Sequence, residues 1–72
     1  MNQATAKDVG PQVRSALAES PVFDLHDVRV EHNGSGILLS GTVSSFYHKQ
    51  LAQEVVRHVA GEIAVVNAID VG

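Results

Sequence analysis

The most constraining feature of this chain is the stretch from Ile37 to Gly61, in which a strand pattern is followed by a helix pattern without a spacer. From Ile37 to Val43 apolar residues fall on one face of an extended segment, which predicts a half-buried β-strand. Ser44 and Ser45 follow, and either one is a suitable N-cap for a helix. Apolar residues then recur at helical spacing as far as Gly61, which suits the C-terminus of a helix. A strand that leads directly into an amphipathic helix is typical of a mixed α and β domain.

A helix is also predicted near the N-terminus, from about Asp8 to Ser20. Its apolar positions lie on one side of a helical wheel: Val9, Val13, Ala16 and Leu17. Asp8 is the expected N-cap, and Pro11 then falls in the first turn, where its missing N–H does little harm. Ser20 and Pro21 end this helix. In the loop that follows, we expect Leu25 and either Val22 or Phe23 to close the end of the core.

Two further segments alternate like strands, one from Val28 to His32 and one from Ile63 to Val71. The turn signal Asn33–Gly36 lies between the first of these and the strand that begins at Ile37, which predicts a β-hairpin. Gly41 is expected on the inward face, where a missing side chain lets a helix approach. In the last segment the expected inward residues are Ile63, Val65, Asn67, Ile69 and Val71. The predicted order is therefore α-β-β-α-β.

Composition limits the functions that a chain of this kind can have. Seventy-two residues, 44% of them hydrophobic, make one small domain with a core. We expect residues 1–7 to be a flexible polar tail and residues 8–72 to form this domain. There is no cysteine for a disulfide or a zinc–thiolate site. A net charge of −3 is a poor match for nucleic acid and gives no overall attraction to an anionic membrane. No apolar run is long enough to span a bilayer, and the N-terminus as written lacks the apolar segment of a signal peptide. We therefore expect a cytoplasmic chain as written, unless it is a trimmed piece of an exported protein.

Three motifs in this order and spacing resemble the BON domain, a module of bacterial osmotically induced periplasmic and nodulation-associated proteins. They are Ile37-x-Leu39-Ser40-Gly41-Thr42-Val43, then Ala52, Val55, Val56 and Val59-x-Gly61, then Val65-Val66-Asn67-x-Ile69-x-Val71. The segment from Val13 to Leu17 and the Val28-x-Val30 pair also fit, so the resemblance covers about residues 8 to 71. Two positions depart from the family pattern: the hairpin turn is longer and glycine-rich, and Glu62 stands where an apolar residue is more usual.

The resemblance implies an α+β fold in which a three-stranded mixed sheet carries two helices packed on one face. It implies a non-catalytic binding module without a cofactor. The role usually proposed for the family is attachment to phospholipid membranes or to envelope partners. Its members are typically exported and periplasmic or envelope-associated, whereas this sequence as written shows no signal peptide.

Residue patterns for catalysis or metal binding are weak. The four histidines include no His-x-x-x-His pair, and His48 and His58 do not share a helical face. Gly34-Ser35-Gly36 lacks the outer glycines of a nucleophile elbow, and the turn explains both of its glycines. Asp24 and Asp27 are better interpreted as turn and strand-entry residues than as a general acid and base. We therefore predict no catalytic residue and no metal site.

One side of the second predicted helix is the leading candidate site. Its residues are Phe46, Lys49, Gln53 and Arg57, an aromatic ring in line with two cations. Such a line suits a phospholipid headgroup or an acidic partner. The alternative is that Phe46 folds back over the helix start and the remaining side chains are simply solvated. Because the apolar face of this helix is needed for the core, only a shallow contact at headgroup level is expected.

The sheet face opposite the helices is the second candidate. Leu38, Val66 and Ala68 form a small apolar patch there if their strands are adjacent. Such a patch beside a free edge strand suits a protein partner or weak self-association of a monomer. The alternative, scattered exposed apolar residues, is common in soluble domains. Asn67, on the inward face, is interpreted as a buried hydrogen-bonding residue and not as a ligand contact.

Overall fold

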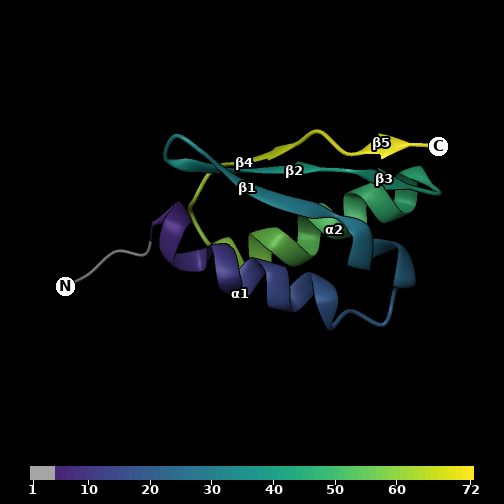
Figure 1. The fold of residues 1–72 in the computed structure, drawn as a ribbon, viewed down its shortest axis with the longest axis horizontal. Coiled ribbons are helices and arrows are strands. Elements are labelled where there is room, and N and C mark those ends of the chain that lie inside the picture. The colour runs from purple at the N-terminus through teal and green to yellow at the C-terminus, as the bar shows by residue number, and fades with distance from the viewer. Residues whose placement is uncertain (1–4) are drawn as a thin grey trace.

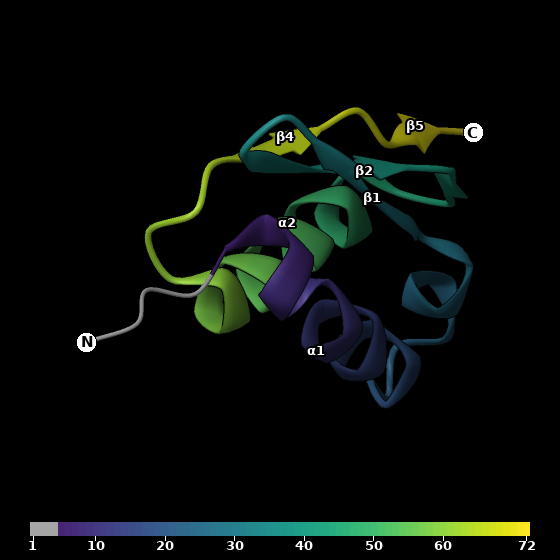
Figure 2. The same cartoon turned by 60° about the vertical axis from the view of Figure 1, so that its left-hand side comes forward.

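The computed structural model describes residues 5–72 and confirms the predicted α-β-β-α-β order within an α+β fold. Two helices pack against the same side of a sheet, as two views of the ribbon show (Figures 1 and 2). The elements are α1 (Ala6–Ala18), the 3-10 helix η1 (Phe23–Asp27), β1 (Arg29–Asn33), β2 (Gly36–Ser40), β3 (Thr42–Val43), α2 (Phe46–Ala60), β4 (Val65–Asn67) and β5 (Asp70–Val71). The short helix η1 replaces the loop that the sequence predicts between α1 and β1.

The main sheet has three strands in the order β1-β2-β4 and is mixed, as expected. β1 and β2 form an antiparallel hairpin in which Val30 lies opposite Leu39. β4 lies parallel to β2 on its other side, with Leu38 opposite Val66. A parallel connection needs a crossover, and α2 provides it. The helix that follows the central strand therefore lies over the sheet.

The parallel ladder between β2 and β4 is interrupted at Gly41 and Ala68 and then resumes between β3 and β5. We refer to this interruption as the crease. β3 and β5 form a second parallel ladder, in which Thr42 lies opposite Asp70. Hydrogen bonds bridge the crease: the Asp70 N–H donates to the Gly41 carbonyl at 2.8 Å, and the Ala68 N–H donates to the Leu39 carbonyl at 2.9 Å. The same sequence separation relates the paired residues on both sides of the crease. The single strand predicted from Ile63 to Val71 is thus two short strands with one common register.

The start of α1 differs from the prediction. Thr5 is the N-cap and forms a capping box with Asp8, because the Asp8 N–H donates to Thr5 Oγ1 and the Thr5 N–H donates to the Asp8 carboxylate, both at 3.2 Å. Asp8 is therefore the third helical residue and not the N-cap. Pro11 lies inside the helix and not in its first turn, so its missing N–H leaves one helical hydrogen bond unmade. Of the predicted tail, residues 1–4 lie outside the described residues, and Thr5 belongs to the helix cap.

Glycines at two positions shape the strands around β2. The hairpin turns through Gly34 and Ser35, with Gly34 at a φ of +63° and Asn33 paired with Gly36, so the glycine-rich segment makes a tight turn. Gly41 has a φ of +115°, and a Cβ there would lie 3.0 Å from the Asp27 carbonyl oxygen. The close neighbour of Gly41 is therefore the backbone at the end of η1, and not a helix packed on the inward face as predicted.

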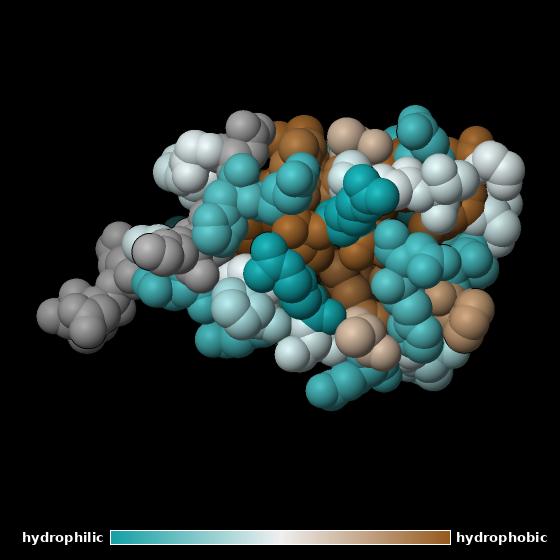
Figure 3. All heavy atoms as spheres, viewed as in Figure 1, coloured by the Kyte–Doolittle hydropathy of each residue, from teal (hydrophilic) through white to brown (hydrophobic). Residues whose placement is uncertain are grey.

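The core between the helices and the sheet is entirely aliphatic. Its buried residues are Val9, Val13, Leu17, Leu25, Val30, Ile37, Leu39, Val43, Ala52, Val56, Ala60 and Ile69. In the space-filling view, hydrophobic residues fill the band between the sheet and α1, and polar residues surround them (Figure 3). Leu25 and Val22 close one end of this core, as predicted, whereas Phe23 points into solvent. Val71, expected on the inward face, is 47% exposed, although its partner Val43 across the β3–β5 ladder is buried.

Candidate functional site

The predicted binding residues on α2 lie along one side of the helix, close to the sheet edge that β4 forms. Ser45 caps the helix by accepting a hydrogen bond from the His48 N–H at 3.1 Å. Phe46, in the first turn, is 62% exposed and does not fold back over the helix start. Arg57 is also exposed, whereas Lys49 and Gln53 are half-buried. We refer to Phe46, Lys49, Gln53 and Arg57 as the α2 line.

Asn67 holds the middle of the α2 line against β4. Its amide nitrogen donates to the Lys49 carbonyl oxygen at 3.0 Å and to Gln53 Oε1 at 3.1 Å. Its amide oxygen accepts from the Ile69 N–H at 3.2 Å. These bonds agree with the interpretation of Asn67 as a hydrogen-bonding residue. Because one acceptor is the side-chain amide oxygen of Gln53, this side chain also helps to hold α2 against the sheet.

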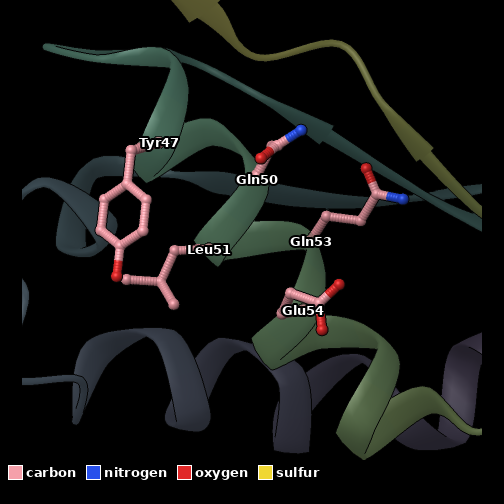
Figure 4. Close-up of a pocket in the computed structure, with 5 residues that line it drawn as sticks. All are labelled: Tyr47, Gln50, Leu51, Gln53 and Glu54. Carbon is pink, nitrogen blue, oxygen red and sulfur yellow. The ribbon is translucent and has the colours of Figure 1, made fainter.

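Two shallow depressions border the α2 line. The first, about 340 Å³, follows the neighbouring side of the helix and is lined by Tyr47, Gln50, Leu51, Gln53 and Glu54. In the close-up view, Tyr47 and Leu51 point toward α1, whereas Gln50 and Gln53 point toward the sheet (Figure 4). The second, about 350 Å³, lies at the C-terminal end of α2, where Gln53 and Arg57 face Gly61–Val65. Both depressions are open to solvent.

The outer face of the sheet brings together the residues of the second candidate site. Leu38 and Val66 are direct partners across β2 and β4, and Ala68 follows Val66 by two residues on the same strand side. Val66 is 49% exposed, Ala68 is exposed and Leu38 is half-buried. The β1 edge of the sheet is partly closed, because an Arg14 guanidinium nitrogen donates to the Val30 carbonyl at 2.9 Å. The open edge is therefore the one formed by β4.

Asp24 makes a cluster that sequence reasoning missed. Its Oδ2 accepts hydrogen bonds from the Ser44 N–H at 2.8 Å, from Ser44 Oγ, and from His48 Nδ1 at 2.6 Å. The two Ser44 donors and then His48 lower the pKa of Asp24 from 3.8 to about 2. We refer to these contacts as the Asp24 junction. It joins η1 to the first turn of α2, so the interpretation of Asp24 as a local turn residue is incomplete.

The Asp24 junction has the residue types of a hydrolase triad but not its geometry. In a triad the histidine lies between the serine and the carboxylate, so that it can remove the serine proton. Here Ser44 and His48 both bind the same carboxylate oxygen, and the Ser44 hydroxyl donates its proton to Asp24. This arrangement holds two segments together and does not activate a nucleophile.

The comparison with known families agrees with the fold and with the element order. The family model of the BON domain matches residues 7–72. The chain belongs to the BON domain family. A search among curated proteins found no match. The family consists of small non-catalytic binding modules of envelope proteins, which places this BON domain among binding modules.

Among residues 5–72, no three His, Asp or Glu side chains come close enough to hold a metal ion together. No helix in the same part of the chain is both long and apolar enough to cross a bilayer.

The aromatic side chains of this BON domain all lie on its surface. The sequence has two phenylalanines, one tyrosine and no tryptophan. Phe23 is 78% exposed and Tyr47 is 67% exposed, and Phe46 is exposed as described above. None of the three contributes to the aliphatic core. The wheel pattern of α2 predicts this exposure for Phe46, whereas no sequence signal predicts it for Phe23.

Proposed function

We propose that this BON domain attaches weakly to phospholipid headgroups through the α2 line. The observation that carries the proposal is the exposure of Phe46, which stands in solvent on the same side of α2 as Lys49 and Arg57. The one ion pair among the described residues joins His48 to Asp24, so the two cations of the α2 line are available to phosphate groups. Glu54 is the one carboxylate on the helix itself.

Physical magnitudes agree with a weak attachment. Each Lys or Arg near an anionic membrane surface contributes about 1 kcal/mol, so Lys49 and Arg57 together contribute about 2 kcal/mol. Shallow insertion of Phe46 adds about 1–2 kcal/mol, a part of the value for full burial of the side chain. The net charge of −3 opposes approach to an anionic surface. The contact is therefore reversible and sensitive to salt.

Sedimentation with lipid vesicles tests the proposal. The double variant Phe46→Ala, Lys49→Glu should lose most of its binding to vesicles of phosphatidylcholine and phosphatidylglycerol in equal parts. Arg29→Glu removes an exposed cation from β1 and is the matched control, with binding close to that of the native domain. Binding should also weaken steeply with salt, because the Debye length falls to about 3 Å at 1 M. Unchanged binding of the double variant would show that the α2 line is not the site.

A second candidate function is protein association through the outer sheet face. The observation that favours it is the direct pairing of Leu38 with Val66, which places two apolar side chains next to each other beside the open β4 edge. Association through this patch should be insensitive to salt. Sedimentation equilibrium at high protein concentration tests it: a monomer that Leu38→Glu does not alter would eliminate self-association through this face.

A further inference from the structure

One end of the molecule displays all three aromatic side chains. Phe23 belongs to η1, and Phe46 and Tyr47 belong to the first turn of α2. In both ribbon views η1 lies at the same end of the molecule as β3 and β5, and α2 begins immediately after β3 (Figures 1 and 2). We refer to Phe23, Phe46 and Tyr47 as the aromatic end.

The Asp24 junction explains how two distant segments share this end. Phe23 precedes Asp24 in the chain, and Tyr47 precedes His48, while Asp24 Oδ2 lies 2.6 Å from His48 Nδ1. Ring contacts extend from this centre: the Phe23 and His26 ring centroids are 5.3 Å apart, and those of Tyr47 and His48 are 5.8 Å apart. The junction therefore fixes the position of Phe23 relative to the start of α2.

Exposure of these rings is costly for a domain of this size. A chain of 72 residues needs most of its apolar side chains for its core, and yet its three largest apolar side chains are exposed to water. A surface that covers the rings would recover this free energy. The three rings are themselves uncharged, whereas the domain as a whole carries a net charge of −3.

We propose that the aromatic end inserts into the interfacial region of a phospholipid bilayer, with the Asp24 junction as its positioning element. This inference rests on the proposed headgroup attachment and adds a second contact to it. Aromatic rings, and above all amphipathic ones such as Tyr47, prefer the depth of the headgroups, where the ring is covered and the hydroxyl stays hydrated. Phe23 and Phe46 are both more than half exposed and line neither of the depressions described above, so both rings are available for insertion. A chain repelled by anionic lipid also needs a contact that does not depend on charge.

Tryptophan substitutions test the depth of insertion, since the native sequence contains none. With vesicles of pure phosphatidylcholine, and of phosphatidylcholine and phosphatidylglycerol in equal parts, the emission of Phe23→Trp should shift to the blue. Brominated acyl chains should quench it. Val66→Trp, on the outer sheet face, is the matched control and should show neither change. Both positions are exposed, so both variants should retain the native far-UV circular dichroism spectrum.

Partition measurements give the second readout. Phe23→Ala should weaken partition about tenfold, by the same factor at low and high salt, because the lost contact is apolar. Val66→Ala should leave partition unchanged. In an Asp24→Asn background the effect of Phe23→Ala should shrink, whereas the effect of Lys49→Glu should persist. Equal effects of Phe23→Ala in both backgrounds would overturn the positioning role of the junction.

The outcomes separate this inference from the proposed function. If the native domain sediments with vesicles while Phe23→Trp stays unshifted and Phe23→Ala binds normally, the aromatic end is not inserted and the headgroup attachment stands. If the native domain sediments with neither kind of vesicle, both proposals are wrong. If Phe23→Trp shifts with protein concentration and without lipid, the aromatic end is an interface between copies of the chain and the lipid assignment is overturned.

Discussion

Replacement of Asn67 by alanine should destabilise the fold more than any other single change at a half-buried polar side chain of the sheet. The alanine variant loses three hydrogen bonds, to the Lys49 carbonyl, to Gln53 Oε1 and from the Ile69 N–H. One such bond contributes about 0.5–1.5 kcal/mol, and a buried group left without its partner costs about 1–3 kcal/mol. Because Asn67 is half-buried, water can replace part of this network, and we expect a total loss of about 2 kcal/mol.

The assay is urea unfolding and thermal unfolding followed by far-UV circular dichroism. For a domain of this length 1 kcal/mol shifts the melting temperature by about 4–8 °C, so Asn67→Ala should lower it by about 10 °C. Gln53→Ala removes one of the three bonds and should cost less than about 1 kcal/mol. Gln50→Ala, at an exposed position of the same helix, is the matched control and should lie within about 0.5 kcal/mol of the native domain.

Asn67→Asp separates the donor and acceptor roles of the side chain. The carboxylate can still accept from the Ile69 N–H, but it places an oxygen where the native amide donates to Lys49 and Gln53. At neutral pH it should therefore be at least as destabilising as alanine. An alanine variant within about 0.5 kcal/mol of the native domain would refute this account of Asn67, because surface substitutions produce changes of that size.

Four other substitutions test the cap, the core and the Asp24 junction. Ser45→Ala should cost about 1 kcal/mol in urea unfolding, because the His48 N–H loses its acceptor at the start of α2, and an unchanged midpoint would contradict this. Leu25→Ala should cost about 2–5 kcal/mol, because Leu25 is completely buried, whereas Phe23→Ala in the same short helix should have little effect on stability. The folded pKa of Asp24, about 2, lies below its ordinary value of 3.8, so its contribution to stability is complete above pH 3.8 and is lost as the pH falls toward 2. Asp24→Asn should remove this part of the acid dependence of the melting temperature, and identical pH profiles for the two proteins would argue against the junction.

Local patterns in the sequence are sufficient to predict the order of the elements. The helical spacing after Ser45, the turn at Gly34 and the alternation in β1 depend on neighbours in the chain, and all three predictions agree with the structure. The cap of α1 was predicted wrongly although the signal is present. Thr5 and Asp8 have the spacing of a capping box, but the helical pattern of apolar residues draws the expected boundary to Asp8.

Contacts between distant segments were the part that the sequence did not reveal. Asp24 reaches Ser44 and His48 across more than one element, and no local pattern indicates such a partner. The helical wheel of α2 places His48 on the same side as the core residues. In the structure its imidazole instead binds the Asp24 carboxylate. Phe23 is exposed on η1, a helix that the pattern of residues Val22 to Leu25 does not predict. For the α2 line, sequence identifies a shared helical side but cannot show that Asn67 engages Gln53.

The crease at Gly41 limits how the length of this domain can vary during evolution. Because the ladders on its two sides share one register, loss or gain of a single residue in either strand would shift every pair beyond it and exchange the buried and exposed faces of that part. Val43 would then leave the core, and Thr42 would enter it. Natural insertions and deletions should therefore be absent from the segments around Gly41 and Ala68. They should occur instead in the turn at Gly34 and Ser35, where a Cβ built on Gly34 would have no neighbouring atom within 4 Å.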